Sequence, residues 1–90
     1  MSQLHNAETQ EHRLEASIHA LFRRCPALCG FTVQEASGLF IGEITINPLA
    51  GRQAHSYLHG EIVAALGTLI DEYPEARELL RERTFARVLH

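Results

Sequence analysis

The stretch FTVQEASGLFIGEITIN, residues 31–47, decides the fold, because apolar and polar side chains alternate along it with a period of two. This alternation is typical of β-strands, and the Ser37-Gly38 pair in its middle is typical of a turn. In the second half, one predicted face holds Phe40, Gly42, Ile44 and Ile46. The opposite face holds Leu39, Ile41, Glu43 and Thr45. We therefore predict an antiparallel β-hairpin.

The second predicted strand carries large apolar side chains on both faces. We expect the face with Phe40, Ile44 and Ile46 to lie against helices of the same chain. The face with Leu39 and Ile41 then needs cover from elsewhere. Because an isolated two-stranded sheet is marginally stable in water and a short chain has few elements to cover it, we expect dimerisation to complete the fold.

Helical periodicity flanks the hairpin on both sides. The first predicted helix carries the apolar stripe Leu14, Ile18, Leu21, Phe22 and Cys25, and it ends near Pro26. The second, over residues 53–73, carries the arc Leu58, Ile62, Ala65, Leu66, Leu69, Ile70 and Tyr73 and ends before Pro74. A short charged helix follows at 75–83. The predicted fold class is α+β, with the order α-β-β-α-α and helices packed on the hairpin.

The length of 90 residues and the 46% hydrophobic content suit one domain, residues 1–90, and not two. Residues 1–6 are polar, and we expect them to fray. Residues 84–90 contain Phe85, Val88 and Leu89, which do not continue the face of the short helix before them. We interpret them as an apolar tail that docks on the fold or on a second chain.

The charge balance argues against a nucleic-acid partner. Eight basic residues stand against eleven acidic ones, and all eight are arginine. The absence of lysine excludes a P-loop and a Schiff-base lysine. The C-terminal arginines alternate with glutamates, which is typical of a solvated salt-bridge lattice; they are Arg77, Arg81, Arg83 and Arg87. We expect no nucleic-acid binding.

The sequence shows no pattern typical of a membrane span or of a secretory signal. No apolar run approaches the roughly 18 residues of a membrane span, and the N-terminus lacks the apolar centre of a signal peptide. Two cysteines are too few for a disulfide framework. We expect a cytoplasmic protein that does not bind membranes.

Two pairs of residues form a candidate zinc site, Cys25 with Cys29 and His55 with His59. Thiolates and imidazoles are the usual zinc ligands, and four of them close a tetrahedral structural site. The 25 residues between the pairs exceed the roughly 12 to 20 of familiar zinc patterns. The alternative is two core thiols and two histidines in the first turns of a helix. We expect no cofactor, with zinc as the alternative.

The start of the second long helix offers an acid–base grouping of His55, Tyr57, His59 and Glu61. Histidine titrates near neutral pH, so an enzyme site between subunits is an alternative reading of this helix. The sequence has no nucleophile elbow and no phosphate-binding loop. We therefore assign no catalytic residue.

A ridge of small residues lies opposite the apolar arc of that helix: Ser56, Gly60, Ala64, Gly67 and Asp71. Glycine within a helix costs about 1 kcal/mol relative to alanine, so close approach of another helix would explain the two glycines. The alternative is a tolerated, exposed pair. The predicted interface residues are Leu39, Ile41, Gly60, Gly67, Phe85, Val88 and Leu89.

These patterns favour a small homodimeric binding protein, accessory or regulatory, without catalytic activity of its own. A further protein partner is part of this expectation. The two alternatives are a zinc-stabilised module and an enzyme with a site between subunits.

Overall fold

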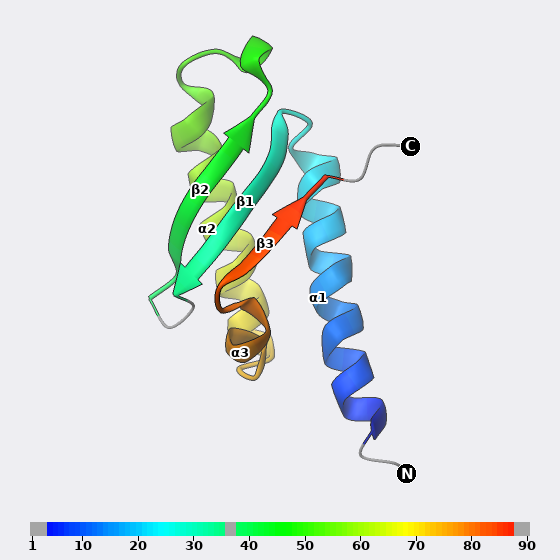
Figure 1. The fold of residues 1–90 in the computed structure, drawn as a ribbon. Coiled ribbons are helices and arrows are strands. Elements are labelled where there is room, and N and C mark those ends of the chain that lie inside the picture. Colours follow the sequence, from blue (N-terminus) through cyan, green and yellow to red (C-terminus); the bar gives the residue numbers. More distant parts are fainter. Residues whose placement is uncertain (1–3, 36–37, 88–90) are drawn as a thin grey trace.

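The computed structural model describes the backbone of residues 4–35 and 38–87, with side chains from residue 10 onward. Along the chain come α1 (Leu4–Arg24), β1 (Leu28–Glu35), β2 (Phe40–Ile46), the 3-10 turn η1 (Pro48–Ala50), α2 (Ala54–Glu72), α3 (Ala76–Leu80) and β3 (Arg83–Ala86). The strands form one antiparallel sheet in the order β2-β1-β3 (Figure 1). The α+β class is confirmed, and the predicted hairpin is β1 with β2.

The two long helices lie on one side of the sheet (Figure 1). The apolar stripe of α1 and the apolar arc of α2 meet there, with Leu14, Leu21 and Leu66 fully buried. Pro74 follows directly after the C-cap residue of α2, Tyr73, as expected for a residue that cannot continue a helix. In the described residues, no helix is both long and apolar enough to cross a membrane.

The register of the hairpin contains three irregularities, and the one between Phe31 and Val33 changes which side chains face the helices. Phe31 pairs with Ile44 and Val33 pairs with Ile41, so β2 advances by three residues where β1 advances by two. One extra residue shifts the phase of the alternation, and the side chains beyond it change faces. Ile41 is consequently only 6% exposed, and Phe40 is 58% exposed. The predicted facing of Phe40 and Ile41 is therefore wrong, whereas Ile44 packs against the core as expected.

The chain end forms a strand that the sequence pattern did not predict. Residues Arg83–Ala86 pair with the free side of β1, and the rings of Phe85 and Phe31 lie 5.2 Å apart between centroids. Gly30 permits this approach, because a Cβ there would lie 2.9 Å from the Phe85 carbonyl oxygen. The first residues of the predicted tail, 84–86, thus dock on the fold, and they do so as part of a strand, which was not predicted. Val88 and Leu89 lie outside the described residues.

The sheet has one covered and one uncovered face. Among the described residues, all helices lie on the side that holds Phe31 and Val33, and the opposite side carries no second layer (Figure 1). The principal extents are 49 × 32 × 18 Å, and the smallest suits one sheet with one helix layer.

Candidate functional site

The four candidate zinc ligands do not come together. Cys25, just beyond the end of α1, is 2% exposed, and the half-buried Cys29 of β1 donates to the carbonyl oxygen of Ala27 at 3.9 Å. His55 and His59 lie exposed on α2 with 6.4 Å between ring centroids. In the described part of the chain, no three histidine, cysteine, aspartate or glutamate residues are placed to share a metal ion.

The environment of Cys25 suits a structural thiol. Burial raises its pKa above the ordinary value of 9.0, and the nearby Glu61 carboxylate adds to this rise. The positive charges of Arg24 and Arg87 act in the opposite direction and do not cancel it. Because the thiolate is the nucleophile and the metal ligand, a raised pKa makes Cys25 a poor candidate for either role.

The grouping at the start of α2 is an exposed helix surface. Tyr57, His55 and His59 are all exposed, and the Glu61 carboxylate pairs with Arg24 of α1 at 3.1 Å. This ion pair joins the two long helices. It also occupies the one carboxylate that the predicted acid–base grouping would use.

The described members of the predicted interface are mostly engaged within the chain. Leu39 packs over Gly67, with its Cδ1 atom 3.7 Å from the position that a Cβ would take. Ile41 lies in the core, and Phe85 is half-buried against it. Gly60 alone faces open space, with no atom within 4 Å of a built Cβ.

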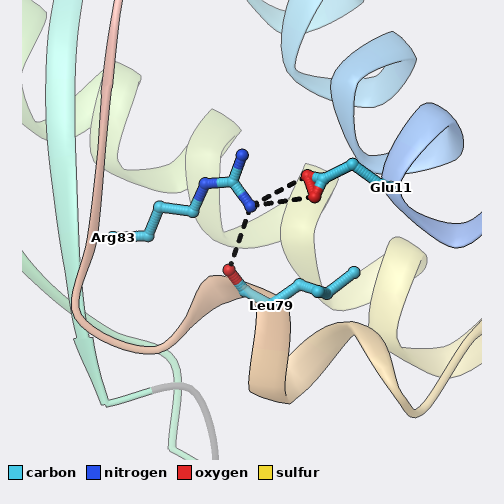
Figure 2. Close-up of polar contacts among 3 residues, drawn as sticks. All are labelled: Glu11, Leu79 and Arg83. Atoms are coloured by element: carbon cyan, nitrogen blue, oxygen red, sulfur yellow. Dashed lines mark hydrogen bonds and ion pairs between the residues drawn. The ribbon is translucent and has the colours of Figure 1, made fainter. Parts of the chain in front are cut away.

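The side chain of Arg83 joins β3 to α1. Its Nη1 atom lies 3.0 Å and 3.2 Å from the two carboxylate oxygens of Glu11 (Figure 2). The same atom lies 3.4 Å from the Leu79 carbonyl oxygen, at the end of α3. One guanidinium thus contacts elements that are far apart in the sequence.

Arg87 makes a second link at the other end of β3. Its Nη2 atom donates to the carbonyl oxygens of Phe22 and Cys25, at 2.7 and 2.8 Å, and its Nε atom donates to Leu28 at 3.0 Å. The last carbonyls of a helix lack partners within the helix and attract positive charge. Arg87 therefore caps the C-terminal end of α1 with a side chain from the end of the chain.

A groove lies between α1 and β3, beside Arg87. Its volume is about 210 Å³, and its lining consists of Ile18, His19, Phe22, Arg23, Phe85, Ala86 and Arg87. The apolar side chains come from both elements, and among the side chains that the structure describes no acidic one lines the groove. Sequence reasoning missed this groove because β3 was not predicted. The alternation of Arg83, Phe85 and Arg87 was the available signal.

The uncovered face of the sheet carries short and polar side chains. Thr32 of β1 and Thr84 of β3 lie opposite each other, with 3.2 Å between their hydroxyl oxygens. A shallow hollow of about 200 Å³ beside them is also lined by Cys29, Glu43 and Thr45.

Comparisons with protein family models, with curated proteins and with solved structures find no match for this chain.

Proposed function

We propose that this protein is a homodimeric binding module, accessory or regulatory in role, that acts through its surfaces without chemistry of its own. The observation that carries the proposal is the uncovered face of the three-stranded sheet (Figure 1). A second copy that packs on this face would give each sheet its missing second layer.

The composition of the uncovered face supports sheet-on-sheet packing. Thr32, Thr45 and Thr84 are short side chains without charge, and β-branched residues pack well on a pleated surface. Glu43 is the one charged residue that lines the hollow on this face. Phe40, at the start of β2, adds a large exposed apolar group. The short uncharged side chains and the exposed Phe40 ring support the packing of a second copy on this face.

Native mass spectrometry with multi-angle light scattering tests the dimer, with Phe40→Glu as the probe variant. A charge on the uncovered face should make the protein monomeric and leave its circular dichroism unchanged. Leu49→Glu is the matched control, because Leu49 is 92% exposed in η1, at the opposite end of β2. A monomeric wild type, or a Phe40→Glu variant that remains dimeric, would refute this interface.

A further inference from the structure

We propose that the groove between α1 and β3 binds an extended acidic segment of a partner protein, which adds to the sheet as a strand beside β3. This inference rests on the proposed function, since it names the ligand class of the binding module. It differs from the dimer surface in location, because the groove lies at the edge of the sheet on the helix side.

The first argument is the free backbone edge of β3. Arg87 N–H donates to the Cys29 carbonyl oxygen, and the register continues with Phe85 opposite Phe31. Bonded pairs alternate along an antiparallel ladder, so the N–H and C=O groups of Thr84 and Ala86 point away from β1. β3 is the last strand of the sheet in the described residues, which leaves this edge open to a further strand.

The second argument is the groove beside that edge. Phe22 and Ile18 of α1 face Phe85 of β3 across it, and its volume of about 210 Å³ suits one apolar side chain. The addition of an extended peptide to an exposed sheet edge, with pockets for alternate side chains, is a recurrent mode of peptide recognition. Main-chain hydrogen bonds hold the peptide, and alternate side chains enter the groove.

The third argument is charge, which selects the occupant. His19, Arg23 and Arg87 line the groove, and no acidic side chain does among those of residues 10–35 and 38–87. Within residues 10–35 and 38–87, no carboxylate lies at ion-pair distance from Arg23 or Arg87. A partner with carboxylates next to an apolar residue would complement this lining. A second copy that paired through its own β3 would instead bring Arg23 and Arg87 of both copies together.

The fourth argument is preorganisation. The Arg83–Glu11 pair and the three hydrogen bonds of Arg87 fix both ends of β3 to α1 and its surroundings. Both walls of the groove are therefore held in place before a ligand arrives. Preorganised sites lose less free energy to ordering on binding.

The test uses a fluorescein-labelled peptide, Ser-Glu-Thr-Phe-Thr-Glu-Ser, in which the two glutamates and the phenylalanine share one face of a strand. The matched peptide carries lysine in place of both glutamates. Binding to the full chain is followed by fluorescence anisotropy at concentrations up to about 1 mM. We expect the acidic peptide to bind at least about tenfold more tightly than the lysine peptide. Equal binding of the two peptides, or no binding of the acidic one, would overturn the inference.

Two variants locate the bound peptide. Arg23→Glu should weaken binding about tenfold, whereas Arg52→Glu, the same change in the turn before α2, should have no effect. Ala86→Pro should abolish binding, because it removes an outward N–H group and leaves the bonds to β1 intact. Amide chemical shifts of Thr84 and Ala86 should move in the wild type. Unchanged affinity in both Arg23→Glu and Ala86→Pro would place the peptide elsewhere and refute the assignment.

Native mass spectrometry of the same samples separates the two proposals. Dimers that do not bind the acidic peptide would leave the dimer proposal standing and remove the groove. Monomers that bind it with the expected dependence on Arg23 would leave the groove and remove the dimer.

Discussion

Arg87 Nη2 donates to the carbonyl oxygen of Phe22 at 2.7 Å and thereby joins the end of β3 to the last turn of α1. With its bonds to Cys25 and Leu28, this guanidinium satisfies three carbonyl oxygens. The Arg87 Cζ atom also lies 5.2 Å from the centroid of the Phe22 ring. These contacts of Arg87 hold β3, one wall of the proposed groove, against α1, the other wall.

Replacing Arg87 should therefore destabilise the fold. In Arg87→Ala, three carbonyl oxygens lose a charged donor, and the end of α1 loses a favourable charge. We expect a loss of about 2 kcal/mol in the free energy of unfolding, measured by urea denaturation. Arg52→Ala removes an exposed arginine and should change stability by less than about 0.5 kcal/mol. Equal stabilities of the two variants would contradict the capping role.

The shifted register of β2 makes opposite predictions for two neighbouring residues. Ile41→Ala should cost about 2–4 kcal/mol, because it leaves a cavity in the core. Phe40→Ala removes a larger but exposed side chain and should cost less than about 1 kcal/mol. Thermal unfolding of the two variants checks the phase of the strand. A larger loss of stability in Phe40→Ala than in Ile41→Ala would contradict the shifted register and support the facing predicted from the sequence.

Two glycines should also respond in opposite ways to alanine. A Cβ at Gly60 meets open space, so Gly60→Ala should stabilise α2 by up to about 1 kcal/mol. A Cβ at Gly30 would press on the Phe85 carbonyl oxygen, so Gly30→Ala should cost about 1–3 kcal/mol. Chemical denaturation measures both changes. A Gly60→Ala variant that is less stable than the wild type would contradict the open space at this position.

The raised pKa of Cys25 predicts a loss of stability at alkaline pH. The unfolded chain releases the thiol proton near pH 9.0, whereas the folded chain holds it to higher pH. Stability from this group is therefore complete below pH 9 and declines as the pH rises above it. We expect the stability difference between wild type and Cys25→Ala to narrow above pH 9, measured by urea denaturation across the pH range. A difference that widens there would show that the pKa shift has the opposite sign.

The reactivity of the two thiols offers a check at one pH. At pH 8, iodoacetamide should modify the half-buried Cys29 in the folded protein and Cys25 only after unfolding. Mass spectrometry with peptide mapping identifies the modified residue. Faster modification of Cys25 in the folded state would contradict its burial.

The candidate sites show which features of a site the sequence can predict and which it cannot. The Cys25/Cys29 and His55/His59 pairs have the right chemistry, but their side chains do not come together among the described residues. Cys25 is buried beyond the end of α1, Cys29 lies half-buried in β1, and both histidines are exposed on α2. The groove beside β3 could not be predicted in the same way. It needs Phe85 and Arg87 placed next to Phe22, which is more than 60 residues away in the chain.

The sequence by itself determined the α+β class, the two long helices and the β1–β2 hairpin, because periods of 3.6 and 2 are local properties of the chain. It also identified most of the helical core, including Leu14, Leu21 and Leu66. Only the tertiary structure decided the third strand, the facing of Ile41 and the arginine links to α1. β3 spans four residues, too few for a clear period, and it forms because the free edge of β1 supplies its hydrogen-bond partners.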